Sequence, residues 1–89
     1  MIPTHKDETF DVTVRPYFDG LSPRYELTVD QHWNSEDGFT GYGQSGVVRA
    51  DLPSVAQIKV TLHANGLRLA GDWTYGHSGW MGNKARRIK

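Results

Sequence analysis

Apolar and polar residues alternate with a period of two in three successive segments of the chain. The first covers residues 10–18, the second covers residues 25–33, and the third extends over residues 39–49. Clusters of turn-forming residues at 19–24 and 34–38 separate these segments. Because alternation places every second side chain on the same face, the three segments predict an antiparallel meander of three strands.

The period changes after residue 50. Asp51 is suited to cap a helix, and Pro53 is tolerated in a first helical turn. Three apolar residues then recur at helical spacing on one face: Val55, Ile58 and Leu62. Asn65-Gly66 supplies the stop, because glycine readily takes the left-handed backbone that ends a helix. A helix over 51–66 is predicted, and a β-hairpin that turns at Asn65-Gly66 is the alternative.

Residues 67–75 alternate again and predict a fourth strand, whereas residues 76–89 show no period and predict an irregular, basic C-terminal tail. Residues 1–89 are expected to form a single α+β domain with the element order β-β-β-α-β. A right-handed crossover through the helix places the fourth strand parallel to the third, which gives the sheet order 3-2-1-4. The helix covers one face of the sheet, and the other face stays open.

This element order resembles the first half of the ribonuclease-H-like fold. The resemblance is one of topology alone, and it implies two-metal nuclease chemistry carried by clustered carboxylates. Residues 52–65 contain no acidic residue, so the predicted helix supplies none of those carboxylates. We therefore expect no nuclease activity.

Gly41, Gly43 and Gly46 form a G-x-G-x-x-G pattern within the sequence TGYGQSGVV. A dinucleotide-binding fingerprint needs a helix that begins directly after these glycines, but residues 47–50 intervene. The V-A-I-K, H-R-D and D-F-G motifs of protein kinases are also missing. No bound cofactor is predicted.

The alternation also suggests how the strands pair. We expect Phe18 to lie opposite Tyr25, and Trp33 to lie opposite Phe39. In this register the first two glycines of the pattern face the helix side of the sheet. Glycine weakens a strand unless another group must come close, so these two glycines are expected to leave room for the helix.

The same register places Asp11 opposite His32 on the open face, where the two could serve as an acid and a base. No serine or cysteine is expected beside them to act as a nucleophile, so no enzymatic activity is predicted. The four histidines lie far apart with no repeated ligand spacing, and no metal site is predicted: His5, His32, His63 and His77.

The amino-acid composition and the distribution of charge indicate which class of protein to expect. The chain has no cysteine, and no apolar run approaches the roughly 20 residues that span a bilayer. The N-terminal residues lack the apolar core of a signal peptide, so a cytoplasmic protein is expected. Residues 1–51 carry four basic against nine acidic residues, whereas residues 52–89 carry six basic against one acidic residue. Such asymmetry is typical of a recognition surface.

These observations predict a small non-enzymatic protein-binding module, an inhibitor or adaptor of the phage or plasmid type that occupies a surface of a larger partner. Aromatic residues and arginine dominate interface energetics, so the expected anchors are Tyr17, Tyr42, Trp80, Arg86 and Arg87. Four acidic residues are expected to attract a basic patch on that partner: Glu26, Asp30, Glu36 and Asp37. Self-association through a sheet face or edge is a further possibility.

The alternative function is nucleic-acid binding through residues 75–89. This segment combines aromatic rings with four cations, which is the composition that single-stranded nucleic acids require. The aromatic and histidine residues are Tyr75, His77 and Trp80, and the cations are Lys84, Arg86, Arg87 and Lys89. The acidic first half of the chain opposes this hypothesis, because it repels phosphates unless it faces away from them.

Overall fold

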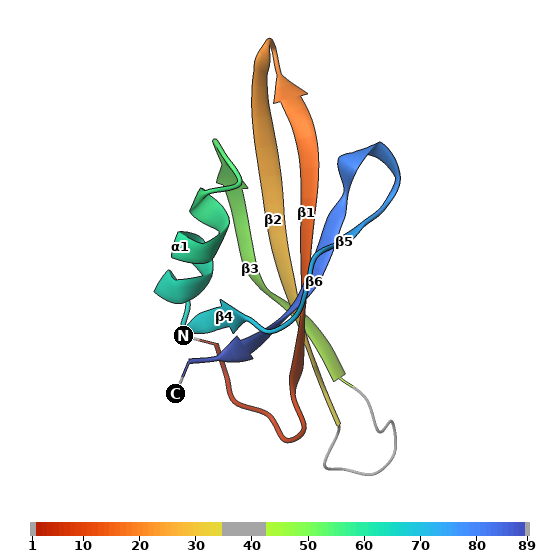
Figure 1. Ribbon diagram of the computed structural model, residues 1–89. Coiled ribbons are helices and arrows are strands. Elements are labelled where there is room, and N and C mark those ends of the chain that lie inside the picture. Colours follow the sequence, from red (N-terminus) through yellow and green to blue (C-terminus); the bar gives the residue numbers. More distant parts are fainter. Residues whose placement is uncertain (1, 35–42, 89) are drawn as a thin grey trace.

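The computed structural model describes residues 2–34 and 43–88. In this part of the chain six strands form one sheet, and one α-helix packs on it (Figure 1). The strands are β1 (Thr9–Asp19), β2 (Ser22–Trp33), β3 (Gly43–Leu52), β4 (Leu67–Leu69), β5 (Thr74–Tyr75) and β6 (Met81–Arg87); the helix is α1 (Gln57–Ala64), and a 3-10 turn, η1 (His77–Gly79), precedes β6. The predicted α+β class and the meander of the first three strands are confirmed.

All neighbouring strands are antiparallel, in the order β3-β2-β1-β6-β4, with β5 also paired to β6. The strand beside β1 is therefore β6, and the prediction of an irregular tail at residues 76–89 is wrong. The side chains of β6 that share a face with the core include Asn83 and Arg87. Because these positions are polar, the strand has no apolar alternation that sequence reasoning could detect.

The predicted fourth strand at 67–75 is two short strands, β4 and β5, which both pair with β6. The alternating antiparallel pairs leave β4 parallel to β3, as the crossover rule predicts. The predicted order 3-2-1-4 is broadly retained, with β6 inserted between β1 and β4. The strand next to β1 was predicted to be parallel to it, but β6 is antiparallel. The resemblance to the ribonuclease-H-like fold is therefore limited to the first three strands.

The helix is confirmed, but it begins six residues later than predicted. Asp51 does not cap it, because Asp51 belongs to β3 and pairs there with Glu26. Helix α1 begins at Gln57 and ends before Gly66, whose φ of +75° is the left-handed backbone expected of a helix stop. The alternative hairpin at Asn65-Gly66 is therefore wrong.

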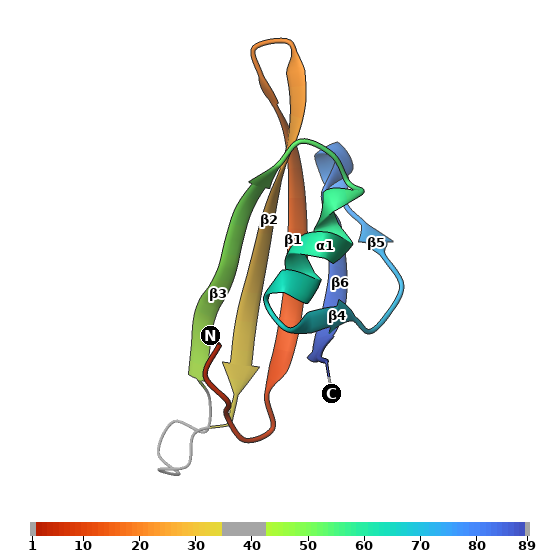
Figure 2. The same ribbon diagram turned by 90° about the vertical axis from the view of Figure 1, so that its left-hand side faces the viewer.

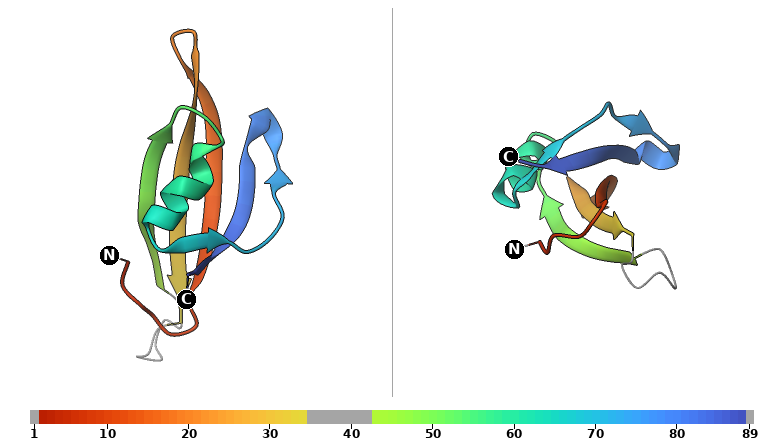
Figure 3. Two further views of the ribbon diagram at one scale, coloured as in Figure 1. Left: turned by 60° about the vertical axis from the view of Figure 1, so that its left-hand side comes forward. Right: turned by 90° about the horizontal axis from the view of Figure 1, so that it is seen from below.

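The sheet curls around the apolar core, and α1 lies against β3 and β4 (Figures 2 and 3). Alternate side chains of every long strand point into this core, together with Ile2 from the N-terminal segment. The other buried members are Phe10, Val12, Val14, Leu27, Val29, Val48, Leu52, Ile58, Leu62, Leu67 and Ala85. The opposite face carries polar and charged residues, as predicted.

The register between β1 and β2 differs from the predicted one by two residues. Asp19 pairs with Ser22 and Phe18 pairs with Pro23, so the loop between the strands contains only Gly20 and Leu21. Gly20 has a φ of +62° and Leu21 a negative φ, as a type II′ turn requires. A shift of two residues keeps each side chain on its predicted face and changes its partner across the strands.

The second predicted register is also wrong, since Trp33 pairs with Gly43 rather than with Phe39. Gly43 leaves room for the indole of Trp33 and not for the helix: a Cβ at Gly43 would lie 2.3 Å from Cε2 of Trp33. The ring of Trp33 also stacks on His5, with 3.9 Å between ring centroids. Gly43 and Gly46 lie within β3, whereas Gly41 is outside the described residues.

Replacing Gly43 with alanine is expected to lower the free energy of unfolding by about 1–3 kcal/mol, because the new methyl group forces Trp33 out of its packed position. Thermal unfolding and the emission maximum of tryptophan measure this effect. Gly46→Ala is the matched control, since a Cβ there meets only Oδ1 of Asp30, at 3.5 Å. Equal losses in the two variants would contradict the role assigned to Gly43.

Candidate functional site

The β1–β2 hairpin projects beyond the rest of the sheet (Figures 1 and 2). Pairing of β1 with β6 ends at Val14, and pairing of β2 with β3 ends at Tyr25. Residues 17–24 therefore pair only with one another. The two-residue turn closes the hairpin tightly, so the projection is a regular two-stranded ribbon rather than a loose loop.

The tip of this hairpin carries two large apolar side chains. Leu21 is 99% exposed and Phe18 is 75% exposed. Phe18 lies on the same face of β1 as Val12 and Val14. At Phe18, however, the hairpin extends beyond the core, so this side chain is exposed. Exposed apolar groups that gather on a projecting element are typical of interaction sites. Sequence reasoning missed Phe18 because an apolar residue at an alternating position normally indicates burial, and it missed Leu21 because that residue falls within the predicted turn at 19–24.

Prolines protect both edges of the hairpin. In a two-residue hairpin the cross-strand pairs alternate between hydrogen-bonded and non-hydrogen-bonded, starting from the hydrogen-bonded pair next to the turn. By this alternation Pro23 and Pro16 occupy non-hydrogen-bonded positions, where a backbone N–H would point outward. Proline has no N–H to offer there, so a further strand cannot pair with these edges in the usual way. The apolar side chains at the tip are therefore the available contact.

A set of polar contacts on the open face fixes the base of the hairpin to β3. The hydroxyl of Tyr17 donates a hydrogen bond to Oδ1 of Asp51, with 2.6 Å between the oxygens. Nη2 of Arg24 lies 3.0 Å from Oδ2 of the same carboxylate. The Tyr17 hydroxyl and the Arg24 guanidinium hold the pKa of Asp51 below its ordinary value, and Asp51 in turn raises the pKa of Tyr17. Exposed contacts of this kind add little stability, but they connect three strands.

Two of the predicted partner-binding residues on this face are thus engaged within the chain. Tyr17 bonds to Asp51, and Glu26 lies 3.5 Å from both Arg15 and Arg49, measured between carboxylate oxygens and guanidinium nitrogens. The open face is a set of internal charge pairs rather than a bare acidic surface. A partner that docked flat on it would have to replace these pairs.

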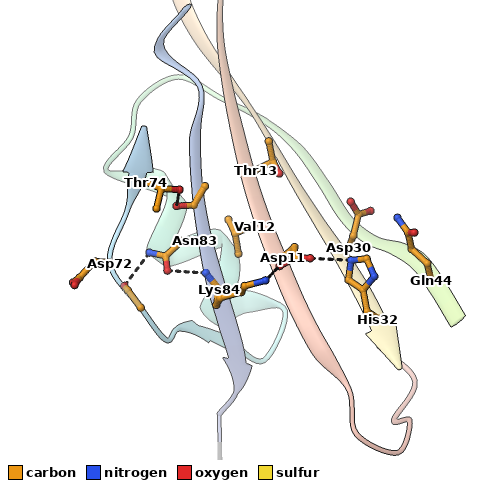
Figure 4. Close-up of a pocket in the computed structure, with 12 residues that line it drawn as sticks. Asp11, Val12, Thr13, Asp30, His32, Gln44, Asp72, Thr74, Asn83 and Lys84 are labelled. Carbon is orange, nitrogen blue, oxygen red and sulfur yellow. Dashed lines mark hydrogen bonds and ion pairs between the residues drawn. The ribbon is translucent and has the colours of Figure 1, made fainter. Parts of the chain in front are cut away.

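A polar pocket of about 670 Å³ lies further along the sheet (Figure 4). Asp11 and His32 meet there as predicted, with 2.9 Å between Oδ2 and Nε2, although the residue directly opposite His32 is Thr9. Lys84 from β6 forms an ion pair with the other carboxylate oxygen of Asp11. Asp30 also lines the pocket, and none of the described residues that line it is a serine or a cysteine. The arrangement resembles a stabilising charge network more than an activated nucleophile.

The basic C-terminal segment does not act as one patch. Arg87 points to the core side, where it forms an ion pair with Glu8 and donates to the carbonyl oxygen of Pro3, at 2.6 Å. Glu8 raises the pKa of Arg87, and Arg87 lowers the pKa of Glu8. Arg86 points outward, directly opposite Arg68 on β4. Arg87 thus holds the N-terminal segment to β6, and its use as an anchor for a partner stays a prediction.

The remaining predicted anchors lie apart from one another. Trp80 is 44% exposed between η1 and β6. Its neighbour Gly79 approaches Pro16, near the base of the hairpin. Tyr42, Glu36 and Asp37 are outside the described residues. Among the anchors that are described, none lies at the hairpin tip, so sequence reasoning found the surroundings of this element and missed its apolar end.

An apolar groove of about 590 Å³ runs between the helix and the strands that follow it. Among the described residues, Lys59 is the only charged one that lines it. The helix side of the groove consists of Val55, Ala56, Ile58 and Lys59, and the strand side consists of Leu69, Trp73, Tyr75 and Met81. Val55 and Tyr75 are substantially exposed, so the groove is open to an incoming apolar side chain.

No protein-family model, curated protein or solved structure matches the chain. Within residues 2–34 and 43–88, no three histidine or acidic side chains are grouped so as to hold a metal ion. No helix in that part of the chain has the length and apolar character needed to cross a membrane.

Proposed function

We propose that the protein is a non-enzymatic protein-binding module, an inhibitor or adaptor that inserts the tip of its β1–β2 hairpin into an apolar pocket of a larger partner. The observation that carries this proposal is the exposure of Leu21 and Phe18 at the end of a projecting, tightly closed hairpin. A buried leucine or phenylalanine side chain gains roughly 1.5–3 kcal/mol relative to an exposed one. This gain is available only when another molecule covers the tip.

The rigidity of the hairpin supports the same proposal. The turn is closed by Gly20 in left-handed backbone, and the base is held by Tyr17, Arg24 and Asp51. A preorganised element loses little conformational entropy on binding, so more of the apolar gain remains as affinity. The prolines on both edges favour contact through the tip over strand addition.

Nucleic-acid binding through residues 75–89 has less support. Two of the four cations in that segment, Lys84 and Arg87, form ion pairs with Asp11 and Glu8. Arg86 and the neighbouring Arg68 remain directed outward, but two exposed arginines release few counterions. A protein partner that accepts the hairpin tip agrees better with the geometry.

Replacing Leu21 with aspartate is expected to reduce binding of the partner at least about 30-fold, because a charge at the centre of an apolar contact costs 2 kcal/mol or more. The partner is the protein that the immobilised chain retains from a cell lysate, identified by mass spectrometry. Val60→Asp is the matched control, since Val60 is 62% exposed on the helix, away from the hairpin. Retention of the same partner by the Leu21→Asp chain would contradict the proposal.

A further inference from the structure

We propose that the hairpin tip of one molecule binds in the apolar groove of a second copy of the same chain. This inference goes beyond the proposed function, because it assigns the tip a second occupant, a copy of the same chain, which competes with the larger partner for Leu21. The chain carries both halves of an apolar contact on different parts of its surface: a projection that ends in Leu21 and Phe18, and a groove between α1 and the strands β4, β5 and β6.

The sizes of the two features are compatible. The groove holds about 590 Å³, which exceeds the volume of a leucine and a phenylalanine side chain together. Its walls are mostly apolar or aromatic, from Val55 and Ile58 on one side to Trp73 and Tyr75 on the other. An apolar tip in such a groove removes apolar surface from water on both molecules.

Charge complementarity favours a second copy over an unrelated apolar segment. Within residues 2–34 and 43–88, Lys59 is the only charged residue that lines the groove, and it is exposed. Asp19 is the charged residue next to the turn, and it is exposed as well. Neither side chain forms an ion pair with another residue in the described part of the chain. In the proposed complex Leu21 occupies the groove and Asp19 pairs with Lys59 at its rim.

The turn between β1 and β2 lies at one end of the molecule and α1 on its flank (Figure 3). The groove is lined by residues of α1, of the turn before it and of the segment from β4 to β6. A molecule therefore cannot fill its own groove, and two copies can exchange their tips reciprocally about a twofold axis. Contact through the tip alone is smaller than a standard interface, so a dissociation constant of about 0.1–1 mM is expected for a single tip and a lower one for a reciprocal dimer.

Sedimentation velocity of the full chain, from about 10 µM to about 1 mM, tests the inference across the expected dissociation constants. The sedimentation coefficient is expected to rise with concentration for the unmodified chain and for Val60→Asp, and to stay monomeric for Leu21→Asp and for Val55→Asp. Val55 precedes α1, lines the groove and is 49% exposed, whereas Val60 lies within α1 and is not among the described residues that line the groove. Circular dichroism checks that each variant is folded.

Exchanging the charges of Asp19 and Lys59 tests the inference in a second way. Asp19→Lys and Lys59→Asp, made singly, are each expected to weaken association about fivefold, and the double variant is expected to restore it. A chain that stays monomeric throughout, or association that persists in both Leu21→Asp and Val55→Asp, would overturn the inference. If the chain is monomeric but a foreign protein still binds in a Leu21-dependent way, the proposed function stands without it. If the chain neither self-associates nor binds a foreign protein through Leu21, the inference and the proposed function are both overturned.

Discussion

Replacing Leu62 with alanine is expected to lower the free energy of unfolding by about 3 kcal/mol, the largest loss among single substitutions considered for this chain. Leu62 has no exposed surface and lies on the side of α1 that faces the sheet. The helix contains only eight residues, and a helix of this length is not stable alone in water. Its position depends on the apolar contacts of Leu62 and Ile58, and a cavity at Leu62 weakens both the helix and its attachment.

Urea unfolding followed by circular dichroism measures this loss, and Val60→Ala provides the control. Val60 lies on the same helix but is 62% exposed, so its truncation removes little buried area and alanine favours helix formation. The control is expected to stay within about 0.5 kcal/mol of the unmodified chain. Comparable losses at the two positions would mean that α1 does not pack through Leu62.

Replacing Arg87 with methionine is expected to cost about 2 kcal/mol, whereas Arg86→Met is expected to be nearly neutral. Methionine keeps the apolar stem of Arg87, which lies beside Phe10 with the guanidinium 5.5 Å from the ring centroid. It removes the charge that pairs with Glu8 and the donors to Ile2 and Pro3. Arg86 has no such contacts in the described residues. Both variants lose one positive charge, so the difference between them measures the effect of the Arg87 contacts alone.

The ion pair between Arg87 and Glu8 predicts that the folded protein loses stability in acid. Arg87 holds the pKa of Glu8 below its ordinary value of 4.5 in the folded protein. The stabilising contribution of the carboxylate is therefore complete above pH 4.5 and is lost as the pH falls through the lowered pKa. Unfolding measured between about pH 6 and pH 3 is expected to show this loss in the unmodified chain and a smaller one in Arg87→Met. Identical pH profiles would contradict the assigned ion pair.

Sequence reasoning succeeded where one side of an element is buried and the other is not. The strict alternation in 10–18 and 25–33 gave the first two strands and the faces of their side chains. Gly66 marked the end of the helix because a left-handed position has few alternatives to glycine. Asp11 and His32 were also placed together correctly, since a change of register by two residues leaves both on the same face.

The failures have equally specific causes. Strand β6 has Asn83 and Arg87 on its core-facing side, and their polar groups are satisfied by Gly71, Glu8 and the N-terminal segment, which lie far from them in sequence. The turn at Gly20 was read as a broad cluster of turn formers rather than as a two-residue loop. Phe18 was missed because no local pattern distinguishes an apolar residue that faces the core from one that extends beyond it, and Leu21 was missed because it lies within the predicted turn.

The attachment of residues 2–8 to β6 brings the two ends of the described chain to the same region, away from the hairpin (Figure 1). A tether, fluorophore or second protein joined to either end leaves Leu21 facing outward and unobstructed. Other short sequences could be grafted between Asp19 and Ser22, because that pair already fixes the spacing of the two strands. The fold is thereby a natural scaffold for displaying a peptide at the end of a rigid arm.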